Sequence, residues 1–342
     1  MQNNIHSSIF NIHFKGGPTV RLPKFEYYEP KAIKEAVSIL QNEPKARILA
    51  GGTDLLVNMK YRVECPPVVV NIKRIADLDY IRQDNGDMRI GALVPLKRLY
   101  MAAPVKDNLP GLAQAASCVG SYHHQVMGTV GGNVCQQNRC KYFNQSKWWR
   151  SSRPTCYKAG GEICHVVNKK EICYSAYCGD LAPALLALGA KVKLAGTQGE
   201  REIPLQEFFT GNGKAPLNLE NGEILSEIMI PAASAKGTLG YMKFANRESI
   251  DFPIVGTAFW ASSEDKAYRV AFTAVDRKPL RGKTIEDFLR GKELTDENIK
   301  AAGDLAGKEA GPVKTSIYSP SHKRKMMGLL LRSVAEKTRG AR

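Results

Sequence analysis

The sequence predicts an α+β protein with more than one hydrophobic core, and three observations support this prediction. At 342 residues the chain exceeds one ordinary core, so we expect two or three subdomains. A strand, a glycine turn and a helix follow one another over residues 48–60, which is typical of an α/β unit. From about residue 237, three successive strand patterns precede helical ones, which indicates a separate α+β domain.

The elements of the first part follow from apolar spacing and from the turn residues between them. Residues 1–21 form an expected extension, in which the glycines and proline at 16–18 indicate a turn. Pro30 begins a helix whose apolar residues recur at helical spacing from Ile33 to Leu40. The other elements expected before residue 232 are strands over 48–50, 68–72 and 88–94, helices starting at Pro95 and over 109–119, a helix and then a strand within 183–194, and a strand over 223–231.

The last hundred residues change in character. Three apolar stretches, 241–245, 254–262 and 268–275, read as successive strands, and helix starts follow at 284–290. Ser319 and Pro320 form a good N-cap and first-turn pair, so they predict the start of a final helix through Val334.

Composition excludes some classes of protein. The chain has no run of 18 or more apolar residues, so no membrane span is expected. The N-terminus lacks an apolar core of secretory type, which favours a cytoplasmic, reducing compartment. The net charge of +16 permits nucleic-acid binding, but no nucleic-acid-binding motif accompanies it. We therefore expect neither a nucleic-acid nor a membrane partner, and an acidic protein partner explains the charge at least as well.

A cysteine-rich stretch lies between the two pieces of α/β sequence. Six of the eight cysteines fall between Cys135 and Cys178, and residues 134–179 carry eight Lys or Arg against two Glu, a net of +6. Four of the cysteines are spaced C-x15-C-x7-C-x8-C from Cys140 to Cys173, which lacks the close C-x2–4-C pairs typical of zinc sites. An iron–sulfur cluster, zinc, disulfides and buried free thiols all remain open, and the density of thiols favours a cluster.

Two glycine segments are candidates for phosphate binding. Gly51–Asp54 follows a strand and precedes a helix, an order that lets backbone N–H groups approach an anion. Thr129–Asn133 reads as a second glycine turn. Neither segment matches G-x-G-x-x-G or a P-loop, and either alone could be a simple tight turn. Together with the acid Asp180, they suit a dinucleotide with a long pyrophosphate bridge.

Trp148 and Trp149 are expected to pack the cysteine-rich stretch onto the rest of the protein.

At AGGTDLL, TVGGN and GDLAPALLALGA the sequence resembles the FAD-binding medium subunits of molybdenum hydroxylases, the xanthine and carbon monoxide dehydrogenase family, over residues 22–340. The resemblance implies a p-cresol methylhydroxylase-type FAD-binding fold of two α/β subdomains, and a small α+β C-terminal domain with a three-stranded antiparallel sheet. The implied boundaries are 1–21 for the extension, 22–235 for the FAD-binding domain, 134–179 for an iron–sulfur insert within it, and 236–342 for the C-terminal domain.

The insert itself is similar to that of the 4-hydroxybenzoyl-CoA reductase type within this family. The similar strings are CQQNRCKYFNQSKWWRS, CHVVNKKEICY and SIDFP. This resemblance implies a 4Fe–4S cluster held by Cys140, Cys156, Cys164 and Cys173. It leaves Cys135 and Cys178 near the flavin without ligating iron, and it assigns no role to Cys65 or Cys118.

The resemblance also implies the FAD contacts, residue by residue, and no catalytic residue in this chain. The expected FAD-site residues are Ile48, Leu49, Ala50, Gly51, Gly52, Thr53, Asp54, Leu55, Val119, Thr129, Val130, Gly131, Gly132, Asn133, Asp180, Leu225 and Lys243.

The implied function is electron transfer within a larger oxidoreductase. Substrate chemistry would take place on a molybdenum-cofactor large subunit, and a small subunit would carry two 2Fe–2S clusters. The implied reaction is reductive removal of a phenolic hydroxyl from an aromatic CoA thioester. A one-electron cluster suits a one-electron donor, so we expect a ferredoxin-like carrier. Electron tunnelling fails over long gaps, so we expect the chains to dock tightly, as a dimer of heterotrimers. The basic residues of the insert, Lys169 and Lys170 among them, would attract that acidic carrier.

Three alternatives stay open. The chain could be the FAD subunit of a xanthine or carbon monoxide dehydrogenase-type hydroxylase with another substrate. It could be a self-contained FAD oxidase or dehydrogenase of the same fold. It could also be a basic nucleic-acid-binding protein with a zinc insert, for which steeply salt-dependent DNA affinity is the discriminating property.

Overall fold

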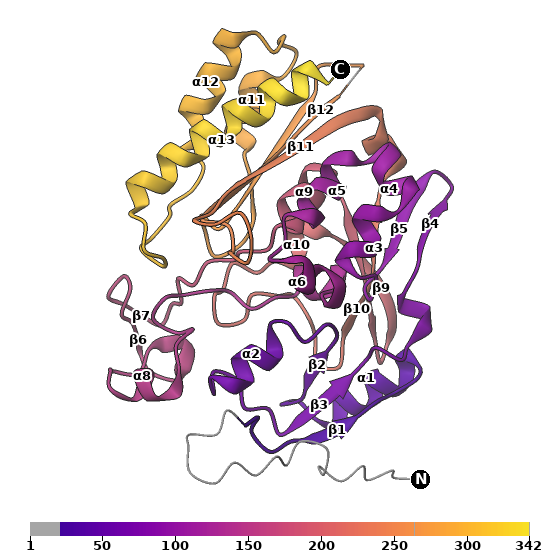
Figure 1. Cartoon of the computed structure of the whole chain (residues 1–342), viewed down its shortest axis with the longest axis vertical. Coiled ribbons are helices and arrows are strands. Elements are labelled where there is room, and N and C mark those ends of the chain that lie inside the picture. Colours follow the sequence, from indigo (N-terminus) through magenta and orange to yellow (C-terminus); the bar gives the residue numbers. More distant parts are fainter. Residues whose placement is uncertain (1–20, 263, 342) are drawn as a thin grey trace.

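The computed structural model describes residues 21–262 and 264–341, so the expected turn at 16–18 and nearly all of the N-terminal extension lie outside the described residues. Figure 1 shows an elongated molecule, with the first residues described at one end and the C-terminal helices at the other. The cysteine-rich insert projects from one side.

The N-terminal unit is a small parallel sheet with one covering helix. Its three strands, β1 (Glu26–Tyr28), β3 (Val68–Asn71) and β2 (Arg47–Leu49), pair in the order β1–β3–β2. Helix α1 (Ile33–Asn42) packs Ala36, Val37 and Leu40 against the buried valines of β3, as its apolar spacing predicts. Helix α2 (Leu55–Lys60) follows β2 across the first glycine segment, so the predicted strand–glycine turn–helix order is confirmed.

The central unit is a five-stranded antiparallel sheet covered by short helices. Strand β10 lies in the middle of the sheet, and every one of its residues is buried. The sheet order is β4 (Ile81–Asp84), β5 (Asp87–Gly91), β10 (Ile224–Ile230), β8 (Lys191–Gly196) and β9 (Gly199–Pro204). The helices of this part of the chain are α3 (Leu96–Met101), α4 (Ala103–Asn108), α5 (Pro110–Ser117), α6 (Tyr122–Met127), α7 (Val130–Val134), α9 (Leu181–Ala187) and α10 (Leu205–Phe208).

One local prediction about this unit is wrong. The second glycine segment is not a turn: it forms the first turn of α7, and Thr129 caps the helix by accepting a hydrogen bond from the Gly132 N–H at 3.1 Å. Gly131 serves close packing instead, since a Cβ on it would lie 2.7 Å from the Cβ of Ala92. This contact with a distant strand end cannot be read from the local sequence.

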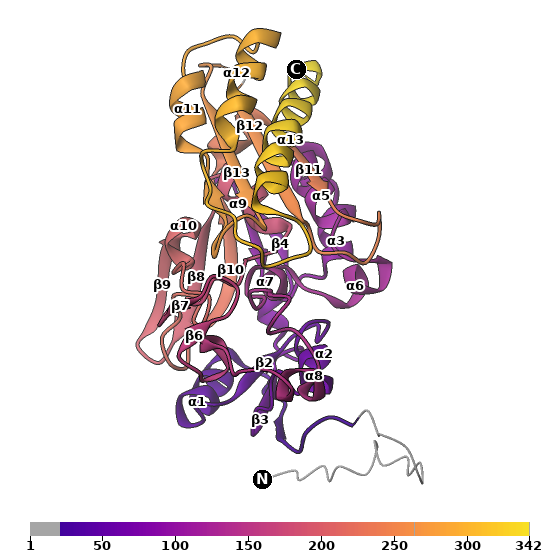
Figure 2. The ribbon, with the colours of Figure 1, turned by 90° about the vertical axis from the view of Figure 1, so that its left-hand side faces the viewer.

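The C-terminal unit confirms the predicted α+β domain. Three long strands, β11 (Gly237–Phe244), β12 (Val255–Ser262) and β13 (Tyr268–Thr273), form an antiparallel sheet, which a two-residue strand, β14 (Leu280–Arg281), extends. Helices α11 (Lys283–Leu289), α12 (Asp296–Ala306) and α13 (Pro320–Gly340) cover one face of it, as Figure 2 shows. Ser319 caps α13 as predicted, accepting from the His322 N–H at 3.2 Å.

The insert is held to both ends of the molecule by backbone hydrogen bonds. It contains α8 (Lys147–Ser151) and the hairpin β6 (Ile163–Cys164) and β7 (Lys169–Lys170). Lys147 donates to the Tyr61 carbonyl at 3.0 Å, and Lys141 donates to the Thr315 carbonyl at 2.9 Å. The expected packing role of Trp148 is wrong, because its side chain is 81% exposed. Across the described residues, we find no helix both long enough and apolar enough to cross a membrane.

Candidate functional site

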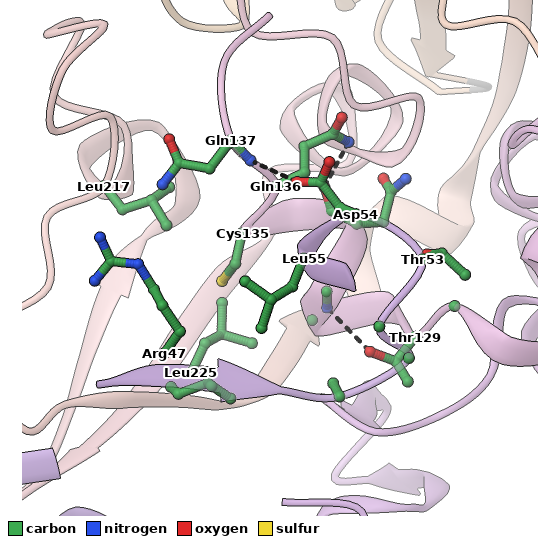
Figure 3. Close-up of a pocket in the computed structure, with 18 of the residues that line it drawn as sticks. Arg47, Thr53, Asp54, Leu55, Thr129, Cys135, Gln136, Gln137, Leu217 and Leu225 are labelled. Atoms are coloured by element: carbon green, nitrogen blue, oxygen red, sulfur yellow. Dashed lines mark hydrogen bonds between the residues drawn. The ribbon is translucent and has the colours of Figure 1, made fainter. Parts of the chain in front are cut away.

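A cavity of about 740 Å³ lies between the N-terminal unit and the central sheet. Its walls come from segments far apart in the sequence: the loop from β2 to α2, the start of α7, the first residues of the insert, and residues 214–225 and 250–252. Figure 3 shows side chains of the first three segments and Leu217 and Leu225 around the same space. A cavity of this volume accommodates a large organic ligand.

The first glycine segment presents unused hydrogen-bond donors to this cavity. Gly52 has φ of +74°, a conformation that glycine adopts at little cost, and it lets the chain reverse before α2 begins. In the described structure, the backbone N–H groups of Gly51, Gly52, Thr53 and Asp54 donate to no protein acceptor, and all four residues line the cavity. Adjacent free N–H groups of this kind form a binding site for an anion such as a phosphate.

The second glycine segment differs, because its N–H groups are already engaged. Val130 and Gly131 each donate at 2.9 Å, to the carbonyls of Val94 and Ala92, and Asn133 donates to the Thr129 carbonyl. The Asn133 side chain in turn accepts from the Leu181 N–H at 3.2 Å. This segment therefore shapes the wall of the cavity, while the first glycine segment offers the donors.

The start of the insert is tied to the first glycine segment through Asp54. Arg139 forms an ion pair with Asp54 at 3.0 Å, and the Gln137 N–H donates to the same carboxylate at 3.3 Å. The guanidinium of Arg139 also stacks over the ring of Phe252, 4.3 Å from its centroid. The contact between Gln137 and Asp54 is drawn in Figure 3. The insert and the cavity are thus directly coupled.

Asp180 is a buried acid on the cavity wall. Its carboxylate accepts from the Tyr241 hydroxyl at 2.9 Å and pairs with Lys243 at 3.2 Å. Burial raises the pKa of Asp180 to about 6, while the Lys243 ammonium opposes that rise. Lys243 also donates to the carbonyls of Cys118 and Asp251, at 2.6 and 3.0 Å. These contacts hold the 250–252 segment beside the acid.

The structure brings most of the expected FAD-site residues to this one cavity. Those that line it are Ile48, Ala50, Gly51, Gly52, Thr53, Asp54, Leu55, Val119, Thr129, Gly131, Gly132, Asn133, Asp180 and Leu225. Leu49, Val130 and Lys243 are not among the lining residues; Val130 lies in the core, and Lys243 reaches the site only through Asp180.

Other lining residues were not anticipated from the sequence. They come from the insert start and from the loops around the cavity, chiefly Arg47, His124, Gln136, Gln137, Arg139, Leu217, Ile250 and Phe252. In the sequence, these residues could have been recognised as site residues only by their position next to motif residues, as for Ile250 and Phe252 within SIDFP. Cys135, which was expected near the flavin, lines the cavity as well.

The four expected iron ligands line a second, smaller cavity within the insert. Cys140, Cys156, Cys164 and Cys173 all contribute to it, together with Tyr142, Phe143, Lys158 and His165. Cys140 accepts from the Tyr142 N–H at 3.4 Å, and the Cys173 thiol donates to the Ser175 hydroxyl at 3.2 Å. Among the described residues, no three His, Cys, Asp or Glu side chains are placed to hold a single metal ion.

Lys158 brings a buried positive charge to the same cavity. Its ammonium donates to the Asn138 carbonyl at 3.2 Å, and burial lowers its pKa, an effect that the neighbouring Cys173 and Cys140 oppose. The cavity thus combines four thiols with a cation that stabilises negative charge. The Lys158 ammonium can therefore stabilise the four cysteines in their thiolate form.

The remaining cysteines lie elsewhere. Cys135 lines the large cavity, and Cys178 is buried beside Ala274. Burial raises the pKa of Cys135 to about 12 and that of Cys178 to about 11. Cys65 is exposed, and none of the eight cysteines forms a disulfide.

Two family models match the chain. Residues 23–233 match the FAD binding domain in molybdopterin dehydrogenase, and residues 240–338 match the CO dehydrogenase flavoprotein C-terminal domain. The match to the first model covers more than half of the chain.

Curated relatives match over most of their length. The nicotinate dehydrogenase FAD-subunit of Eubacterium barkeri is 29% identical, covering 81% of this chain and 83% of that protein. The carbon monoxide dehydrogenase medium chain of Hydrogenophaga pseudoflava is 29% identical, over 91% and 95%. The aldehyde oxidoreductase FAD-binding subunit of Escherichia coli is 30% identical, over 75% and 83%.

Solved structures show the same fold. Carbon monoxide dehydrogenase from Hydrogenophaga pseudoflava, in a form that lacks the Mo-pyranopterin moiety, superposes with a TM-score of 0.77 at 27% identity, covering 94% of this chain and 99% of that chain. Quinoline 2-oxidoreductase from Pseudomonas putida 86 superposes with a TM-score of 0.76 at 23% identity, over 94% and 99%.

Proposed function

The chain belongs to the family of FAD-binding domains in molybdopterin dehydrogenases, and from that premise we propose that it works as the medium chain of a three-chain molybdenum hydroxylase. It is an oxidoreductase subunit that transfers electrons through FAD. In the proposed assembly a large subunit carries the molybdenum cofactor and a small subunit carries two 2Fe–2S clusters, with the three-chain unit doubled.

The observation that carries this proposal is the loop of free N–H groups at the cavity wall. Four adjacent backbone donors at the start of α2 fit the pyrophosphate of FAD, and the cavity of about 740 Å³ leaves room for the rest of the molecule. When bound, the flavin supplies one- and two-electron chemistry. The chain's own part is to bind the phosphates at Gly51–Asp54, to place the Asp180 carboxylate and Lys243 ammonium pair beside the ligand, and to exclude water.

Flavin analysis of the purified protein tests this assignment. One non-covalent FAD per chain is expected, released on acid or heat denaturation. A chain that contains no flavin after anaerobic purification, and that takes up none when FAD is added, would contradict the proposal.

We further propose that the insert, 134–179, is a second cofactor module that holds one 4Fe–4S cluster through Cys140, Cys156, Cys164 and Cys173. Support comes from the convergence of the four thiols on one cavity with the buried ammonium of Lys158. The four cysteines lack the close C-x2–4-C pairs typical of zinc sites, and in a cluster each iron takes one thiolate, so their spacing favours a cluster. The proposed domains are 22–235, including this module, and 236–342.

Serine substitution tests the ligand set. Cys156→Ser is expected to remove the four irons of this site, while Cys65→Ser and Cys118→Ser keep them. Iron and acid-labile sulfide are measured on the purified chain. If Cys135→Ser or Cys178→Ser removes the iron and Cys156→Ser does not, the proposed set is wrong.

The substrate of the complex is the finer part of the proposal. The relatives are named for nicotinate, carbon monoxide and aldehydes. They favour the first candidate, an FAD subunit of a hydroxylase whose substrate is not 4-hydroxybenzoyl-CoA. The insert favours the second candidate, a 4-hydroxybenzoyl-CoA reductase-like complex that takes electrons from a ferredoxin-like carrier. Assaying the purified complex with 4-hydroxybenzoyl-CoA and a reduced low-potential donor, beside nicotinate and xanthine with an oxidant, separates the two.

A further inference from the structure

Positive charge is not evenly distributed over the insert. Residues 134–161 contain six Lys or Arg and no Asp or Glu. The β6–β7 hairpin, in contrast, carries Lys169 and Lys170 together with Glu162 and Glu171, so its charges cancel. The insert is therefore strongly basic around α8 and neutral on the hairpin, so we no longer expect Lys169 and Lys170 to attract an acidic carrier.

The α8 face also carries exposed aromatic side chains. Trp148 is 81% exposed, and Tyr61, at the end of α2, is 53% exposed. The two elements are neighbours, since the Lys147 N–H donates to the Tyr61 carbonyl at 3.0 Å. Lys60, Lys147 and Arg153 around them are exposed. Exposed aromatic side chains on the same elements as exposed cations have the composition of a binding hot spot for an acidic protein.

The α8 face lies directly over the cysteine cavity. Trp149, the residue after Trp148, contacts Tyr142 edge to face at a centroid distance of 5.7 Å. Tyr142 lines the cavity of the four cysteines and stacks on His165, another lining residue, at 5.2 Å. One layer of aromatic side chains therefore separates a molecule docked on α8 from the thiols. Electron tunnelling requires such a short separation.

We propose that the α8 face, defined as Lys60, Tyr61, Lys147, Trp148 and Arg153, is the docking site for an acidic one-electron carrier of ferredoxin type. This inference rests on the proposed cluster in the insert. Trp148 supplies the contact area at the centre, and the surrounding cations steer the carrier and fix its orientation. The carrier gives up one electron, which the insert accepts, so one carrier is oxidised for each electron taken up.

Stopped-flow reduction of the complete complex by a reduced, acidic bacterial ferredoxin tests the site. Trp148→Ala and the double variant Lys147→Glu/Arg153→Glu are each expected to lower the second-order rate constant about tenfold or more. The double variant should also flatten its dependence on ionic strength. Lys169→Glu/Lys170→Glu is the matched control, with the same charge change on the hairpin, and should change the rate less than about twofold. Reduction by dithionite should be unchanged in all three variants.

Three results would overturn the proposal. The hairpin variant could lose the reaction while both α8 variants keep it. All variants could react with ferredoxin at the parental rate at every ionic strength. Trp148→Ala could separate the complex into its chains in analytical ultracentrifugation, which would make this face a subunit interface. Iron analysis of the parent protein distinguishes failure of the proposed cluster from failure of the proposed docking site. A parent without iron refutes the cluster, whatever the docking variants do.

Discussion

The cysteines show at the residue scale how burial decides chemistry. Cys178 is buried and Cys135 is partly buried on the cavity wall, and burial raises the pKa of the two thiols to about 11 and about 12. Only the thiolate is a nucleophile, so both thiols should be inert near neutral pH. Cys65 is exposed at the surface.

Alkylation with iodoacetamide at about pH 8 should therefore modify Cys65 and leave Cys135 and Cys178 unmodified in the folded protein. Peptide mass spectrometry reads out each site, and the same reaction in guanidinium chloride, where all thiols react, is the control. Rapid modification of Cys135 under native conditions would contradict the raised pKa of its thiol.

Gly132 offers the sharpest test of the large cavity. It lines the cavity, and a Cβ there would meet only the Thr129 hydroxyl, at 3.0 Å. In Gly132→Val the new side chain occupies the space of the ligand, so bound flavin should fall to about a tenth or less of one per chain while the fold persists. Flavin absorbance per chain and the circular dichroism melting curve measure the two effects.

Two other glycines separate loss of flavin from loss of stability. Gly311→Val introduces a side chain into open space and should change neither property. Gly131→Val drives a side chain into Ala92 and should lower the melting temperature, because the core there is already packed. If Gly132→Val keeps full flavin content, the cavity is not the flavin site.

Asp180 makes stability depend on pH with a defined sign. The pKa of the folded state is raised from 3.8 to about 6, so between these values the folded protein holds a proton that the unfolded chain has lost. The free energy of unfolding should therefore fall as pH rises through this window, by at most on the order of 3 kcal/mol from this one group. Above about pH 6, the loss of stability from burying the Asp180 carboxylate stays constant.

Asp180→Asn removes this titration. The difference in urea midpoint between the variant and the parent should shift in favour of the variant as pH rises from about 4 to 6. In the variant, Lys243 loses its charged partner at every pH. This lowers the stability of the variant by a constant amount and leaves the difference in pH dependence between the two proteins unchanged. Parallel pH profiles for the two proteins would show that the Asp180 carboxyl does not titrate in this range.

At the scale of elements, the sequence predicted units whose signals are local. The β2–glycine–α2 order, the three strands from β11 to β13, and the Ser319 cap of α13 all follow from periodicity or single residues within one segment. Helix α7 was misread as a turn because glycines suggest turns, whereas its helical form depends on Thr129 capping and on packing against Ala92.

The same limit applies to the candidate site. The residues of the first glycine segment could be predicted because a motif carries them. Arg139 and Phe252 join the site through contacts with partners 85 and 113 positions away along the chain, and such pairings exist only in the folded molecule. Trp148 was expected to be covered, but the insert turns it outward.

Arg139 is the connection between the insert and the cavity. Arg139→Gln removes the ion pair with Asp54 at 3.0 Å and the cation–π contact with Phe252. Both side chains of the pair are partly exposed, so the stability loss should be modest, about 1 kcal/mol. The first glycine segment loses its anchor, and flavin affinity should fall severalfold, measured by titrating the deflavinated protein.

The ion pair of Arg98 and Asp79 supplies the control. Arg98→Gln removes an exposed ion pair whose two residues do not line the cavity, so it should leave flavin affinity unchanged. Equal affinity losses in Arg98→Gln and Arg139→Gln would mean that the effect is general destabilisation rather than a link between insert and cavity.

At the scale of the whole molecule, several exposed apolar side chains lie at the mouth of the large cavity. Ile250 and Phe252 both line the cavity, yet they are 55% and 44% exposed, and Met127 nearby is 46% exposed. Ile250 has φ of +77°, which is strained for a β-branched residue, and its N–H donates to the Gly120 carbonyl at 2.7 Å. Exposed apolar side chains around a mouth mark an interaction site.

In the proposed assembly this mouth faces a partner chain, because a flavin must lie close to the cluster that exchanges electrons with it. Ile250→Asp tests this arrangement: aspartate tolerates a positive φ better than isoleucine, so the chain itself should lose no stability, while a charge enters the apolar rim. We expect the variant complex to dissociate at concentrations about tenfold higher than the parent, measured by mass photometry. Leu329→Asp, on the outward side of α13 and 52% exposed, is the matched control and should assemble like the parent. If Ile250→Asp assembles normally while retaining flavin, the partner does not cover this mouth.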